Sequence, residues 1–172
     1  MPDSRGRWRP FRREATKVRE LPSLGPAWHI VDWTPPRDFD EPIADRFLAI
    51  GPGGVFSVLV VAHGRTRVLL AGDVIQSEGK RYTYVHEARR SAQEVSRQFS
   101  TVIGHNVPVT AVLVLDGDGV ISVHGLPKDC LVATGPELDR LLLATGARIS
   151  AGTAGKLARA ARWLPRPGVP PS

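Results

Sequence analysis

Cysteine is almost absent from this chain, since Cys130 is the only one among 172 residues. A single cysteine excludes an internal disulfide framework, and no Cys/His cluster has the spacing of a zinc site. No apolar run approaches membrane-spanning length, and the arginine-rich start lacks the apolar stretch of a signal peptide. We therefore expect a cytoplasmic protein. What remains, 42% hydrophobic and 23% charged residues, is typical of a soluble globular domain.

Acidic residues are scarce at both ends. The net charge is +6, but residues 1–20 carry +4, residues 148–172 carry +5, and the stretch between them carries −3. Residues 1–11 interleave arginines with Trp8 and Phe11, and we predict a basic flexible arm there. Such an arm suits a nucleic acid, an anionic membrane surface or merely solvent. The acidic middle argues against a fold that is basic throughout.

Residues 43–62 are predicted to form the central hairpin. Two apolar segments flank Gly51-Pro52-Gly53-Gly54, whose residues tolerate or preset turn conformations. The second segment, 55–62, has no polar alternation, which predicts a strand buried on both faces in the middle of a sheet. Asp45 is a carboxylate among apolar neighbours in the first strand and needs a partner, a metal or a wet cleft.

Other elements are predicted around this hairpin. The periodicity predicts helices over 11–21, 86–103, 136–144 and 153–164. Strands are expected at 28–33, 67–71, 74–76, 109–115 and 120–123. A helix of the length of 86–103 between two apolar strands indicates a crossover to the same sheet, and Asp116-Gly117-Asp118-Gly119 reads as a hairpin turn. Cys130, in an apolar stretch, is expected to be a buried, unreactive thiol.

Several of these segments follow one another as in a known family. A helix carrying Glu14, the strand 28–31, the block Ile43–Leu48 and the block Gly51–Phe56 together resemble the nuclease-related domain family of the PD-(D/E)XK, or restriction-endonuclease-like, superfamily. The likeness spans about residues 12–145, and the block from Asp45 to Phe56 is its specific part. It implies an α/β (α+β) fold with an αβββαβ core, in which helices flank a central mixed sheet. The basic helix over 146–164 and a disordered tail, 165–172, would follow this domain.

The resemblance also implies a site. Active members place one acid at a strand end and an acid and a lysine two residues apart on the next strand, where they hold Mg²⁺ and orient the attacking water. Asp45 matches the first acid, but the other two positions fall on Leu59 and Val61. Neither side chain can bind a metal or carry a proton. We therefore predict that the nuclease chemistry is lost and that no cofactor is needed.

An alternative is a site rebuilt from other residues. Glu14 could join Asp45 as a ligand of Mg²⁺, with Glu87, Lys80 and His63 as migrated acid or base groups. Each also has an ordinary interpretation. The glutamates suit early helical turns, His63 a strand end and Lys80 a turn. Asp45 could be paired with Arg46 or with an arginine of a helix.

Three functions remain open. The chain could be an inactive nuclease-like domain that binds DNA, RNA or a protein partner, an active metal-dependent endonuclease, or a purely structural interaction module. The candidate nucleic-acid contacts are the basic residues of the arm and of two helices: Arg5, Arg7, Arg9, Arg89, Arg90, Arg97, Lys156, Arg159 and Arg162.

Overall fold

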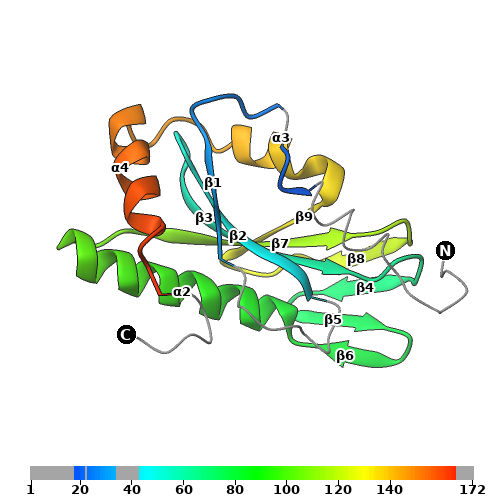
Figure 1. Cartoon of the computed structure of the whole chain (residues 1–172). Helices are drawn as coiled ribbons and strands as arrows, with labels where there is room; N and C mark the ends of the chain where they lie inside the picture. Colours follow the sequence, from blue (N-terminus) through cyan, green and yellow to red (C-terminus); the bar gives the residue numbers. More distant parts are fainter. Residues whose placement is uncertain (1–17, 22, 34–42, 166–172) are drawn as a thin grey trace, which may run out of the picture.

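A computed structural model describes residues 18–21, 23–33 and 43–165. Its main sheet has five strands in the order β1-β2-β3-β7-β9 (Figure 1). These strands are β1 (His29–Asp32), β2 (Ile43–Gly51), β3 (Gly54–Ala62), β7 (Val109–Asp116) and β9 (Cys130–Thr134). The first three pair antiparallel, and β3, β7 and β9 run parallel. The hairpin and the central position predicted for β3 are both confirmed.

A second, smaller sheet has the order β6-β5-β4-β8. It contains β4 (Val68–Ala71), β5 (Val74–Ser77), β6 (Lys80–Tyr82) and β8 (Ile121–Gly125). The predicted hairpin between 109–115 and 120–123 is wrong, because β8 pairs in parallel with β4 and not with β7. The turn at residues 117–119 instead passes the chain from one sheet to the other, and its glycines pack closely on Gly64 and Thr66.

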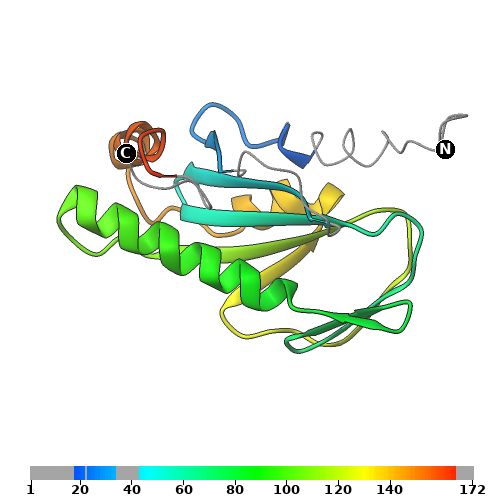
Figure 2. The same cartoon turned by 60° about the horizontal axis from the view of Figure 1, so that its bottom comes forward.

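The helix α2 (Tyr84–Ile103) connects the second sheet back to β7 and covers one face of the main sheet (Figure 2). Its buried residues include Ala88, Ala92, Val95 and Phe99, as the spacing predicts. The helix ends at Gly104, whose N–H donates to the carbonyl of Ser100 at a φ of 91°. It begins two residues earlier than predicted. The same spacing places Val102 on this stripe, but Val102 is 61% exposed. Figure 1 shows the last turn of α2 extending beyond the strands.

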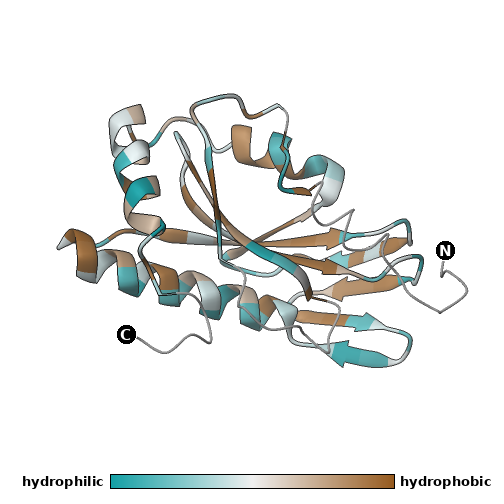
Figure 3. Ribbon diagram, in the orientation of Figure 1, coloured by the Kyte–Doolittle hydropathy of each residue, from teal (hydrophilic) through white to brown (hydrophobic). Residues whose placement is uncertain are grey.

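Two further helices complete the layers. The helix α4 (Ala151–Ala161) lies on the α2 face and packs with residues of β1, β2 and β3. The other face is covered by α3 (Leu138–Leu143), which follows a short 3₁₀ turn, η1 (Gly135–Glu137), and by Val18, Leu21 and Leu24. Figure 3 shows apolar residues concentrated in the strands between these helices. The mixed α/β architecture is thus confirmed in its general form.

Several predicted segments lie outside the described residues. They are the basic arm, most of the helix over 11–21 with Glu14, the loop before β2 and the tail after Pro165. Arg5, Arg7 and Arg9 belong to this part of the chain.

Candidate functional site

The two positions at which the resemblance to nucleases places an acid and a lysine lie in the core beneath α2. Leu59 is 1% exposed and Val61 is 0% exposed. Both belong to an apolar cluster with Tyr84, Val85 and Ala88 of α2. A close-packed apolar environment offers neither an oxygen ligand nor space for a water molecule. A metal-activated water cannot be placed at these two positions.

Asp45 lies on the opposite face of the main sheet. In the β2–β3 ladder Asp45 pairs with Val60, and Arg46 pairs with Leu59. Residues paired across an antiparallel ladder point to the same face. Val60 packs in the cluster formed with α3, whereas Leu59 packs under α2. The expected placement of Asp45 beside Leu59 and Val61 is therefore wrong, because strand alternation separates them.

An arginine holds the Asp45 carboxylate. Nε of Arg19 donates to Oδ2 of Asp45 at 2.5 Å, and Nη2 of the same arginine donates to Oδ1. Arg19 also binds Asp32 at 2.8 Å and lies over the ring of Phe47, 5.4 Å from its centroid. The hydrogen bond to Asp45 raises the pKa of Arg19 above its usual value. Of the two ion-pair partners expected for Asp45, Arg46 and an arginine of a helix, the side chain observed is Arg19 from the predicted helix over 11–21.

The side chain of Arg46 points the other way and defines a groove. Its Nη1 donates to Oγ of Ser91 at 3.2 Å, and its Nη2 lies 3.6 Å from Oε2 of Glu87. The groove has a volume of about 690 Å³ and runs between α2 and the ends of β1 and β2. Its lining residues are Trp33, Arg46, Glu87, Arg90, Ser91, Gln93, Glu94 and Arg97. Glu87 is thus part of a site on the α2 face, away from Asp45.

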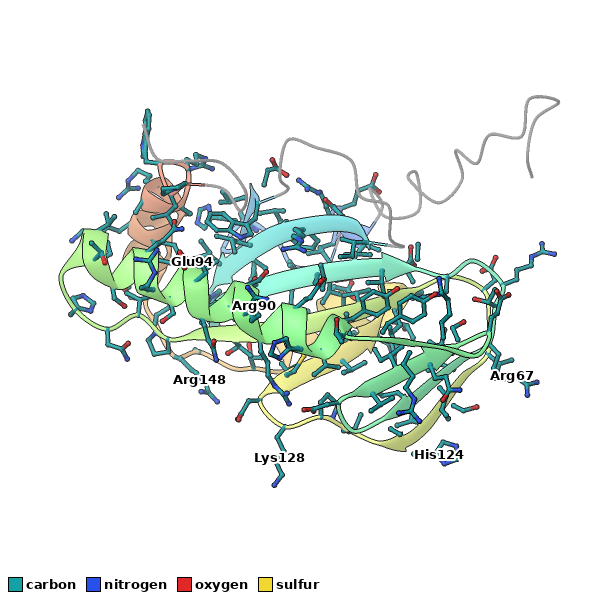
Figure 4. The ribbon with its side chains drawn as sticks, turned by 90° about the horizontal axis from the view of Figure 1, so that it is seen from below. Arg67, Arg90, Glu94, His124, Lys128 and Arg148 are labelled. Atoms are coloured by element: carbon teal, nitrogen blue, oxygen red, sulfur yellow. The ribbon has the colours of Figure 1, made fainter. Side chains whose placement is uncertain are left out.

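Charge in the groove is partly compensated. Arg97 pairs with Glu94 one turn earlier, and this pairing lowers the pKa of the Glu94 carboxyl. Glu87 faces Arg46. Among the described residues Arg90 has no carboxylate partner and is exposed. Arg90 and Glu94 lie on the same side of α2, one turn apart (Figure 4).

Burial shifts the pKa of two titratable groups that lie outside the groove. Nε2 of His63 lies 3.1 Å from the hydroxyl of Tyr84, and desolvation lowers the pKa of this histidine. The His63 ring also makes an edge contact with Tyr82. Cys130 is 6% exposed, and its burial raises the pKa of the thiol to about 11. The predicted burial of this thiol is confirmed.

The candidate catalytic groups that are described do not converge. Asp45 and Glu87 are on different faces of the sheet, His63 lies against Tyr84, and Lys80 is an exposed residue of β6. In residues 18–21, 23–33 and 43–165 no three Asp, Glu, His or Cys side chains are placed to hold a metal ion. The described residues around Asp45 and Leu59 therefore do not fit Mg²⁺, and no catalytic step can be derived through it.

The basic residues selected from the sequence are in three different situations. Arg89 is engaged with Asp73 at 2.7 Å and with the carbonyl of Lys128 at 3.0 Å. Arg90 and Arg97 line the groove. The remaining described ones are exposed on α4 or just after it, namely Lys156, Arg159 and Arg162.

Sequence reasoning missed the groove residues that come from the sheet. Trp33 was assigned only to a strand, and Arg46 only to a strand and to a possible ion pair with Asp45. The sequence signal that could have placed Arg46 on the groove face was its position next to Asp45. Alternation along a strand sends the side chains of neighbouring residues to opposite faces.

Comparisons with protein-family models, with curated proteins and with solved structures gave no match. Across the described residues, no helix combines the length and the apolar character that crossing a bilayer requires. Function is therefore inferred from the geometry of the chain itself.

Proposed function

We propose that this chain is a nuclease-like domain that does not cut phosphodiesters and that binds nucleic acid through the groove between α2 and the main sheet. The observation that carries the proposal is the convergence of Arg46, Arg90 and Arg97 from two separate elements on one groove. Guanidinium groups bind phosphate oxygens in a bidentate way, which makes arginine the preferred residue for nucleic-acid backbones.

Two neutral polar side chains of the lining also support a phosphate ligand, whereas Glu87 and Glu94 are each offset by an arginine. Ser91 and Gln93 add neutral donors beside the arginines. Arg90 is available to an incoming phosphate without breaking an ion pair among the described residues. Arg46 is held by Glu87 and Ser91, so its position is set before a ligand arrives. A prepositioned donor loses less side-chain entropy on binding.

The absence of catalysis is supported by the two faces of β3. The positions that resemble the acid and the lysine of the nuclease family are buried apolar side chains. Asp45 is committed to Arg19 on the other side of the sheet. Phosphodiester cleavage of this kind requires a carboxylate and a lysine two residues apart on one face of the strand. In this chain both positions hold apolar side chains that pack in the core.

Binding is tested by fluorescence anisotropy of a labelled 20-nucleotide single strand and a duplex across a series of salt concentrations. We expect the logarithm of affinity to fall linearly with the logarithm of salt concentration. The double variant R90A/R97A should weaken binding and reduce the slope by about 2 for a duplex, close to one for each lost phosphate contact.

The matched control is R67A/R81A, which removes the same charge from exposed residues of the second-sheet region. Figure 4 shows Arg67 at the end of the molecule away from Arg90. The control variant should leave the slope near that of the wild type. Equal effects of the two double variants would place binding outside the groove. Absence of any salt-dependent binding would refute the nucleic-acid function and favour a structural or protein-interaction module.

Catalysis is tested by incubating plasmid and single-stranded DNA with Mg²⁺ or Mn²⁺. We expect no cleavage. Cleavage that disappears in Asp45→Asn or Glu87→Gln would overturn the non-catalytic part of the proposal and favour a rebuilt nuclease site. Cleavage that persists equally in both variants would indicate a contaminating nuclease.

A further inference from the structure

Trp163 is the most exposed large apolar side chain among the described residues, at 87%. It follows α4 directly, two residues after Ala161. The backbone N–H of Trp163 donates to the carbonyl of Ala160 at 3.0 Å, and the backbone N–H of Leu164 donates to the carbonyl of Ala161 at 3.2 Å. Leu164 is buried, at 6% exposed. The backbone on both sides of Trp163 is thus anchored while its indole remains in solvent.

The end of α4 shares an apolar cluster with one residue of the groove. Ala161 and Leu164 belong to the same apolar cluster as Trp33, which lines the groove. Figure 1 shows the chain after α4 descending to α2 near the point where β1 ends. The segment that carries Trp163 therefore lies on the same face of the main sheet as the site proposed for phosphate binding.

Two basic residues precede Trp163 closely in the sequence. Arg162 precedes it and Arg159 lies one turn earlier, and both are exposed. The stretch from 148 to 172 contains no acidic residue. An exposed aromatic ring flanked by positive charges complements a ligand that has both flat bases and anionic phosphates. The ring can stack on a base while the cations bind phosphates.

We propose that the ligand is a single strand, with its phosphates on the groove arginines and one base stacked on Trp163. This inference rests on the proposed function. In a duplex the faces of the bases are covered by their neighbours, and only an unpaired base can stack on a protein ring. The arrangement therefore selects single-stranded over double-stranded nucleic acid.

The test compares Trp163→Ala with Trp163→Phe in the same anisotropy assay, using a 20-nucleotide oligo(dT) and a duplex of equal length. Trp163→Ala should weaken single-strand binding about 10-fold, a typical loss for one base–aromatic stack, and leave duplex binding within about 2-fold. Trp163→Phe should retain most of the affinity because it keeps a ring. The control Leu126→Ala removes a side chain of the second-sheet region that is 69% exposed and should change neither affinity.

The outcomes separate this inference from the one it rests on. If R90A/R97A weakens binding while Trp163→Ala has no effect on single strands, stacking is refuted and the groove function stands. Equal losses for single strand and duplex in Trp163→Ala would also refute it. Sedimentation with anionic phosphatidylserine vesicles, if abolished by Trp163→Ala while oligo(dT) does not bind, would assign the indole to a membrane surface and overturn the proposal.

Discussion

At the scale of single residues, Arg19 decides what Asp45 does. A carboxylate that is 7% exposed would be expensive to bury alone. Arg19 approaches both of its oxygens and also binds Asp32, so one guanidinium joins the residues before β1 to the ends of β1 and β2. The acid that resembles a catalytic residue therefore has a structural role in the described fold.

Replacing Arg19 should reveal that role. Arg19→Ala leaves the Asp45 carboxylate buried without this guanidinium, and we expect it to lower the free energy of unfolding by about 3 kcal/mol. Urea denaturation followed by circular dichroism measures the change. The added substitution Asp45→Asn should recover part of the loss because it removes the buried charge.

A matched control is Arg97→Ala, which breaks a pair whose side chains are 67% and 42% exposed. Its stability should stay close to that of the wild type, since solvent screens such pairs. If Arg19→Ala were equally mild, the Arg19–Asp45 pair would not be what stabilises this end of the sheet.

At the scale of elements, the hairpin β2–β3 depends on backbone conformations that few residues adopt. Gly54 has a φ of +116°, with open space where a Cβ would stand. The nearby Gly51 and Gly53 are instead restricted by contacts, since a Cβ on them would meet Trp28 and Thr145. The glycine-rich turn is thus required for two different physical reasons.

Two glycine substitutions should therefore have opposite signs. Gly54→Ala forces a side chain into the left-handed region and should destabilise the protein by about 1–2 kcal/mol. Gly155→Ala, inside α4, brings its Cβ only to an ordinary 3.6 Å contact with Arg159 and should stabilise it by about 0.5–1 kcal/mol. Thermal unfolding of both variants gives the comparison. Destabilisation by Gly155→Ala would show that this part of α4 is more closely packed than the structure indicates.

The elements were largely predictable because each depends on local pattern. The β-branched run of β3 and the stripe of small and apolar residues on α2 follow directly from strand and helix periodicity. The turn at residues 117–119 was misassigned because its composition suits a hairpin as well as a change of sheet. Only its packing on Gly64 and Thr66 distinguishes the two.

At the scale of the whole molecule, the two sheets share one core cluster. Leu70 and Ile75 of the second sheet pack with Leu59 and Val61 of the main sheet and with α2. Leu70 is 0% exposed. Because the contacts cross between the sheets, we expect the described core to unfold in one cooperative transition.

Leu70→Ala tests this expectation. The cavity it creates should lower the free energy of unfolding by about 2–5 kcal/mol. The transition should shift by the same amount in tryptophan fluorescence, reported in part by Trp28 and Trp33 of the main-sheet region, and in far-UV circular dichroism. The control Val74→Ala, at a side chain 40% exposed on the second sheet, should shift it little. A fluorescence transition that stays in place would show that the second sheet unfolds by itself.

The sequence alone determined the order and type of most elements, the central place of β3 and the apolar character of positions 59 and 61. These follow from periodicity and residue chemistry, which are local properties. The tertiary structure alone decided that Asp45 faces Arg19 and not α2, and that Arg46, Arg90 and Arg97 line one groove. Such placements depend on a strand register, on a bulge between Ile43 and Asp45 and on where a crossover helix packs. Each arises from contacts between residues that are distant along the chain.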